Sequence, residues 1–67
     1  MDRITLDKIM SAKWCVANLV DHGIKTAKVE TIRKACDTYI GPTETKIILL
    51  GVEEYLSEND VTFTVIA

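Results

Sequence analysis

Two breaks in the amino-acid sequence divide this chain of 67 residues into segments that are each about the length of one helix. Gly23 is the first break, and the pair Gly41-Pro42 is the second. Glycine and proline interrupt regular structure more strongly than other residues, and a chain this short has room for one core only. The sequence therefore predicts a single small helical domain over residues 1–67.

The first segment has the pattern of an amphipathic helix over residues 6–22. At about 100° per residue its apolar side chains gather on one side: Ile9, Ala12, Val16, Leu19 and Val20, with Leu6, Met10 and Ala17 extending the arc. Thr5 is the expected N-cap, and Gly23 is the expected C-terminal stop. Two residues depart from the pattern, because Lys13 falls inside the apolar arc and Trp14 falls on the polar side.

The second segment predicts the most regular helix of the chain, over residues 27–40, with Thr26 as the N-cap. Its apolar residues form one stripe: Val29, Ile32, Ala35, Cys36, Tyr39 and Ile40. The opposite face carries oppositely charged residues at the i,i+4 spacing, which stabilises a helix by roughly 0.2–0.5 kcal/mol per pair. These pairs are Glu30 with Lys34, and Arg33 with Asp37.

The third segment begins at Pro42, the expected first residue of a helix, with Glu44 favourably placed in the first turn. A core stripe follows: Ile48, Leu49, Val52, Tyr55 and Leu56. Ile47 and Leu50 fall outside this stripe, and a helix that is apolar on two sides is typically central or at a subunit contact. A buried strand over residues 46–50 is the competing interpretation, because periodicity is ambiguous for a short apolar run. We favour the helix.

The last segment, residues 61–66, is a predicted strand. It reads Val-Thr-Phe-Thr-Val-Ile, in which apolar and polar residues alternate and β-branched and aromatic types dominate. A strand needs a partner, and the candidates are residues 3–6, residues 46–50 if they are a strand, or the same strand of a second subunit. The predicted fold class is α+β, mostly α: three helices with a short C-terminal strand at one edge.

A set of apolar residues exceeds what one thin core requires. We assign this set to an oligomer interface: Ile47, Leu50, Val61, Phe63 and Val65. An unpaired strand edge is also a template for the addition of another strand, so we expect a homodimer or a higher oligomer. The alternative is that residues 3–6 pair with the strand within one chain and that these side chains fill its core.

The sequence contains no pattern that indicates catalysis, a cofactor or a metal site. His22, the one histidine, falls in the last turn of the first helix, where a positive charge suits the helix dipole. Glu53 and Glu54 are adjacent, so their side chains diverge by about 100° on a helix and do not share a site. Cys15 and Cys36 lack the spacing of a zinc or redox pair. We expect a cytoplasmic, non-enzymatic protein with reduced thiols, of which Cys36 is buried.

Charge is divided unevenly along the chain. Residues 1–34 balance to +3 and residues 35–67 balance to −5, which gives the net charge of −2. The chain as a whole therefore lacks the basic excess of a nucleic-acid-binding domain, although two subunits could pair basic end to acidic end. No membrane contact is expected, since the longest apolar run, residues 47–52, is too short to cross a bilayer.

DNA binding is the alternative function. A helix, a glycine and a second helix in succession are compatible with a transcription regulator of helix-turn-helix or winged-helix type. In that hypothesis four residues would face the DNA: Thr26, Lys28, Thr31 and Lys34. The signal is weak, because any helical hairpin shows the same succession.

One side of the first helix carries the predicted contact patch for a protein partner: Lys13, Trp14, Asn18 and Asp21. Tryptophan is enriched at binding hot spots, and this chain contains only one. The predicted function is that of a small regulatory or inhibitory protein, of the kind that viruses and mobile elements encode, which occupies the surface of another macromolecule. A further alternative is a ligand-sequestering oligomer in which Lys13 holds an anionic ligand.

Overall fold

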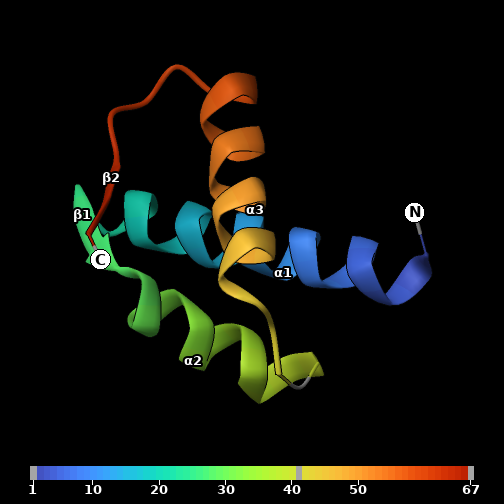
Figure 1. The fold of residues 1–67 in the computed structure, drawn as a ribbon. Helices are drawn as coiled ribbons and strands as arrows, with labels where there is room; N and C mark the ends of the chain where they lie inside the picture. The colour runs from blue at the N-terminus through green and yellow to red at the C-terminus, as the bar shows by residue number, and fades with distance from the viewer. Residues whose placement is uncertain (1, 41, 67) are drawn as a thin grey trace.

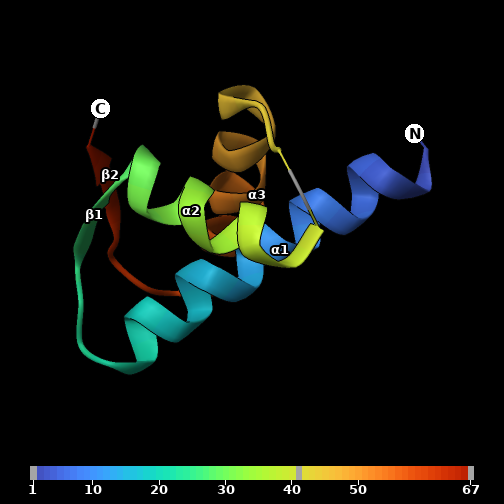
Figure 2. The same cartoon turned by 90° about the horizontal axis from the view of Figure 1, so that it is seen from below.

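The computed structural model describes residues 2–40 and 42–66, leaving aside the side chains of residues 38–40. Its elements follow in the order α1 (Arg3–Asp21), β1 (Thr26–Lys28), α2 (Val29–Ile40), α3 (Thr45–Glu58) and β2 (Thr64–Ile66). The α+β class, mostly α, is confirmed. Helix α3 crosses α1 steeply, α2 lies beside α1, and the two strands lie together near the C-terminal end of α1 (Figures 1 and 2).

The first helix begins ahead of its predicted start, because Asp2 caps it in place of Thr5. The Asp2 carboxylate accepts a hydrogen bond of 2.7 Å from the backbone N–H of Thr5, which satisfies one of the unpaired donors of the first turn. This hydrogen bond holds the pKa of Asp2 below its ordinary value. Residues 3–6 are therefore helical, and they cannot serve as the partner of the C-terminal strand.

The first helix ends at Asp21, and Gly23 is its C-terminal stop, as the sequence predicts. This glycine has a φ of 80°, in the left-handed region that favours glycine. Its N–H donates to the carbonyl of Val20, and the N–H of Ile24 donates to the carbonyl of Leu19, each at 3.0 Å. This pair of bonds is a Schellman motif, which turns the chain away from the helix axis.

The C-terminal strand pairs within the chain, with a partner that the sequence did not indicate. Strand β2 runs parallel to β1, and the register places Thr26 opposite Thr64 and Lys28 opposite Ile66. Thr26 is therefore a strand residue and no N-cap, and α2 starts directly after β1 at Val29. Neither the N-terminal residues nor a second subunit is needed to pair this strand.

The third helix confirms the helical interpretation of residues 46–50. It begins at Thr45, later than predicted, with Glu44 in the N-cap position but without a side-chain capping bond. Pro42 lies outside the helix. Arg33 of α2 anchors the connection before α3, because it donates to the backbone carbonyl of Thr43 at 3.3 Å and to the Thr45 hydroxyl.

The core lies where α1, α2 and α3 meet. Its buried apolar residues are Ile9, Ala12, Val16, Ile32, Cys36, Ile48, Val52 and Phe63. The burial of Cys36 is as predicted. Phe63 differs from its prediction as an interface residue: only 6% of it is exposed, and it packs against the helices of its own chain. The chain before β2 folds back over this core, so an aromatic side chain closes it.

Candidate functional site

A ridge of exposed apolar side chains runs along α1, and we call it the α1 ridge. It consists of Leu6, Met10 and Trp14, which lie four residues apart and therefore on one side of the helix. Trp14 is 73% exposed, more than any other large apolar side chain among the described residues. Leu6 and Met10 were predicted to extend the core-facing arc, but α3 and α2 cover other parts of α1.

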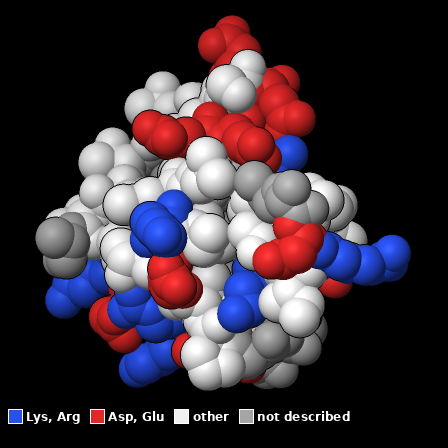
Figure 3. All heavy atoms as spheres, turned by 45° about the vertical axis from the view of Figure 1, so that its right-hand side comes forward, with Lys and Arg blue, Asp and Glu red and all other residues white. Residues whose placement is uncertain are grey.

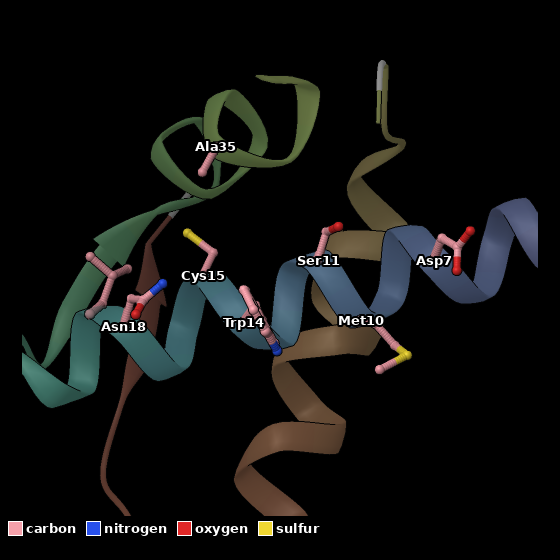
Figure 4. A pocket seen from close by; sticks show the side chains of 8 residues that line it. Asp7, Met10, Ser11, Trp14, Cys15, Asn18 and Ala35 are labelled. Carbon is pink, nitrogen blue, oxygen red and sulfur yellow. The ribbon is translucent and has the colours of Figure 1, made fainter. Parts of the chain in front are cut away.

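A hollow lies beside the ridge, and we call it the α1 groove. Its volume is about 660 Å³, and it is lined by Asp7, Met10, Ser11, Trp14, Cys15, Asn18, Leu19 and Ala35. Figure 4 shows Cys15 pointing from α1 toward Ala35 of α2, while Met10 points to the other side of α1. Helix α1 therefore builds nearly all of the groove, and α2 contributes the small Ala35 side chain that leaves it open.

The chemistry of the groove suits binding of an apolar group. Its walls are mainly apolar, with Asp7, Ser11 and Asn18 as the polar groups. Burial raises the pKa of the Cys15 thiol above its ordinary value. A protonated thiol is a poor nucleophile, so the groove presents Cys15 as a small apolar surface.

Two of the four predicted contact residues line this groove, Trp14 and Asn18. Lys13 faces α3, where its ammonium lies 2.5 Å from Glu58 and 3.9 Å from Glu54. The hydrogen bond with Glu58 raises the pKa of Lys13. Asp21 is exposed at the end of α1 and lies outside the groove.

The contacts of Lys13 bear on two of the sequence hypotheses. An ammonium that is held between two carboxylates of its own chain has its charge already paired. Lys13 is therefore poorly placed both for the partner patch and for the anionic ligand of a sequestering oligomer.

The other six residues of the groove lining were not predicted as contact residues: Asp7, Met10, Ser11, Cys15, Leu19 and Ala35. The i,i+4 spacing of Leu6, Met10 and Trp14 was a signal for the ridge, since three large apolar residues in one row form a continuous surface. The groove itself had no such signal. It depends on where α2 packs against α1, which a single sequence does not show.

A second hollow of about 780 Å³ lies between α3 and β2, and we call it the α3 groove. It is lined by Lys46, Ile47, Leu49, Leu50, Val52, Glu53, Leu56, Phe63, Thr64 and Val65. Four of the five residues predicted at an oligomer interface meet here: Ile47, Leu50, Phe63 and Val65. Val61 is exposed and lies outside the groove.

The residues of the DNA-binding hypothesis are divided between two elements. Thr26 and Lys28 lie on β1, while Thr31 and Lys34 lie on α2, and all four are exposed. The connection between α1 and α2 thus contains a strand, whereas a helix-turn-helix joins its two helices by a turn of about three or four residues.

Acidic side chains gather at the end of the molecule where α3 finishes (Figure 3), and four of the six acidic residues of the C-terminal half lie in this part of the chain. They include Glu53, Glu54, Glu58 and Asp60, all of which are exposed. An acidic group is unfavourable at the C-terminal end of a helix, where the helix dipole is negative. Lys13 partly offsets this charge through its two ion pairs.

His22 caps the end of α1, because its Nδ1 lies 2.7 Å from the backbone carbonyl of Asn18. Among the described residues, no cluster of three or more His, Cys, Asp or Glu side chains could hold a metal ion. In the same part of the chain no helix combines the length and hydropathy of a membrane span. Comparisons with protein-family models, curated proteins and solved structures found no match.

Proposed function

We propose that this protein acts without catalysis, as a small regulatory or inhibitory protein that binds a protein partner through the α1 ridge and the α1 groove. The observation that carries the proposal is the 73% exposure of Trp14 at the edge of an apolar hollow. Large exposed apolar surfaces mark interaction sites, and tryptophan is among the residues that contribute most to binding energy.

The lining of the groove favours a protein over a nucleic acid. Binding to a phosphate backbone depends on lysine and arginine side chains, and neither residue type is present in the groove lining. Its charged residue, Asp7, would repel phosphate. An apolar protein segment instead removes the ridge from water and leaves the polar groups at the rim for hydrogen bonds.

The shape of the groove suits a helical segment. The lining extends along α1 from Asp7 to Leu19, a length of about 18 Å at the helical rise of about 1.5 Å per residue. A partner helix of about three turns has this length, and its apolar side chains at positions i, i+3, i+4 and i+7 would enter the groove. A basic residue at one end of that helix would meet Asp7.

The test compares the purified wild-type protein with two variants. A partner is first captured from an extract of the organism that encodes the protein, identified, and then titrated in purified form. Trp14→Ala is expected to weaken binding by about 30-fold or more, the effect of losing a hot spot. Ile24→Ala is the matched control, because Ile24 is 41% exposed but lies outside the groove.

The emission of the single tryptophan reports the same event directly. Trp14 emission should shift to shorter wavelength when the partner covers it, since the indole leaves water. Circular dichroism establishes that each variant is folded. The proposal fails if Trp14→Ala binds as tightly as the wild type, or if this change unfolds the chain and so identifies Trp14 as part of the core.

A further inference from the structure

The outward face of α3 carries a short pattern of charged and apolar residues. This face is complementary to the same face of a second α3 that runs in the opposite direction. Lys46 and Glu53 both line the α3 groove and lie seven residues apart, which is about two helical turns. Leu49 and Leu50 lie between them on the same side, and Leu49 is 40% exposed. The pattern reads basic, apolar, apolar, acidic along the helix.

Two copies of this pattern match each other when they run in opposite directions around a shared midpoint. The midpoint falls between Leu49 and Leu50. If a second α3 lies antiparallel to the first around a two-fold axis at this point, residues equally far from the midpoint face each other. Lys46 then lies opposite Glu53 of the second copy, and Leu49 lies opposite Leu50 of the second copy.

The charged residues are accessible for such pairing. The ammonium of Lys46 lies 3.5 Å from the Glu44 carboxylate, but 79% of the Lys46 side chain is exposed. An exposed pair of this kind contributes little to stability, so Lys46 can leave Glu44 and pair with Glu53 of a second copy. Glu53 is exposed and forms no ion pair with any residue in the described part of the chain.

Apolar residues continue around the midpoint of this face. The α3 groove continues from Leu49 and Leu50 onto Ile47, Leu56 and Val65. A stable interface covers about 800 Å² on each partner, which is about a sixth of the 4583 Å² surface of this chain. A helix laid along α3 and over the groove removes apolar surface from water on both copies.

We propose that two copies of this chain associate through antiparallel α3 helices, with the two-fold axis between Leu49 and Leu50. Lys46 of each copy pairs with Glu53 of the other, and the leucines meet at the centre. This surface is separate from the α1 ridge and the α1 groove, so a dimer of this kind leaves both open for a protein partner.

Charge reversal tests the pairing. Sedimentation of the full chain over a range of concentrations should show a mass approaching twice 7.5 kDa. Lys46→Glu places a glutamate opposite Glu53 of the other copy at two symmetric positions, and it should raise the dissociation constant by about tenfold or more. Glu53→Lys should do the same, because it places two lysines together.

The double variant K46E/E53K restores opposite charges at both positions, so its dissociation constant should return to within about threefold of the wild type. Arg3→Glu is the matched control: it makes the same change of charge on an exposed residue at the start of α1 and should leave the mass unchanged. Circular dichroism checks that all variants fold.

The outcomes separate this inference from the proposed function. A wild-type chain that stays at 7.5 kDa at high concentration overturns the α3 dimer. The α3 dimer is also overturned if neither single charge reversal changes the dissociation constant, or if the double variant does not restore it. Trp14→Ala should leave the dimer intact, so loss of partner binding in that variant concerns the proposed function alone.

Discussion

Gly51 of α3 and Ala12 of α1 lie so close that a Cβ atom placed on Gly51 would come within 2.7 Å of the Ala12 Cβ. The same atom would lie 2.8 Å from the backbone carbonyl oxygen of Ile9. Glycine and alanine thus let the two helix backbones approach each other at the crossing (Figure 1). This contact fixes where α3 sits, and it therefore sets the position of the face that carries Leu49 and Leu50.

Gly51→Ala is expected to destabilise the protein. The added methyl group overpacks the crossing, which costs about 1–3 kcal/mol, while the better helix propensity of alanine returns up to about 1 kcal/mol. Urea unfolding should show a net loss. Ser57→Ala is the control, because Ser57 lies on an exposed part of α3. If the Gly51→Ala protein is as stable as the wild type, α1 and α3 must lie far enough apart at Gly51 to accommodate a methyl group.

The three helices could be predicted from the sequence because their apolar stripes have helical spacing. The stripe of Val16 in α1 and that of Ile32 in α2 both reach the core, as the periodicity indicated. The stop at Gly23 was also readable, since a left-handed residue after a helix is typically glycine. These features depend on residues that are close together in the sequence, so they can be predicted from a single sequence.

The features that the sequence did not indicate depend on contacts between distant residues. Residues 26–28 read Thr-Ala-Lys, which is too short for an alternating pattern. They form a strand because the segment that begins at Thr64 pairs with them. Phe63 has the alternation of an interface strand, yet it turns inward because the chain folds back over the helices. The α1 groove likewise depends on the packing of α2.

Replacement of Lys13 by methionine should lower the melting temperature by a few degrees. Methionine keeps the apolar stem but removes the cation that lies between Glu54 and Glu58, so three carboxylates at the end of α3, including Glu53, lose their compensation. The difference from wild type should shrink in 1 M salt, where charges are screened.

The pH dependence of the Lys13 contribution has a definite sign. The pKa of Lys13 is raised in the folded chain by its hydrogen bond with Glu58. Its stabilising effect is therefore complete below the ordinary lysine value of 10.5 and is lost as the pH rises further. Lys25→Met is the control, because Lys25 is exposed in the connection between α1 and β1, outside both proposed contact surfaces, and forms no ion pair with a residue of the described part of the chain. Equal losses in the two variants would contradict a special role for Lys13.

The two thiols should differ in reactivity toward iodoacetamide. Burial raises the pKa of Cys36 to about 11, and 1% of the residue is exposed, so Cys36 should stay unmodified at pH 8 in the folded chain. Cys15 lines the α1 groove and should react first, at a rate below that of an unhindered thiol. Peptide mapping by mass spectrometry distinguishes the sites, and both should react in denaturant.

The raised pKa of Cys36 also predicts a change of stability with pH. Above the ordinary thiol value of 9.0 the unfolded chain loses this proton while the folded chain keeps it up to about 11. The free energy of unfolding should therefore fall as the pH rises through this window. Urea unfolding at pH 8 and pH 10 measures the change, and Cys36→Ala should reduce it. An unchanged slope in that variant would assign the effect to other groups.

Phe63 and Val61 lie two residues apart in the segment that leads into β2, and they should respond differently to truncation. Phe63→Ala removes a buried aromatic ring and should cost about 3–5 kcal/mol, which approaches the whole stability of a small domain. Phe63→Leu is the milder variant, with an expected loss of about 1–1.5 kcal/mol. Val61 is 36% exposed, so Val61→Ala should change stability by about 0.5 kcal/mol or less.

Urea unfolding followed by circular dichroism measures all three variants, and sedimentation of the same samples reports association. Because Phe63 packs within its own chain, its replacement should lower stability whether or not a dimer is present. A Phe63→Ala protein with the stability of the wild type but a lower mass would reverse this assignment. Phe63 would then act between subunits, as its place in the alternating sequence of residues 61–66 had suggested.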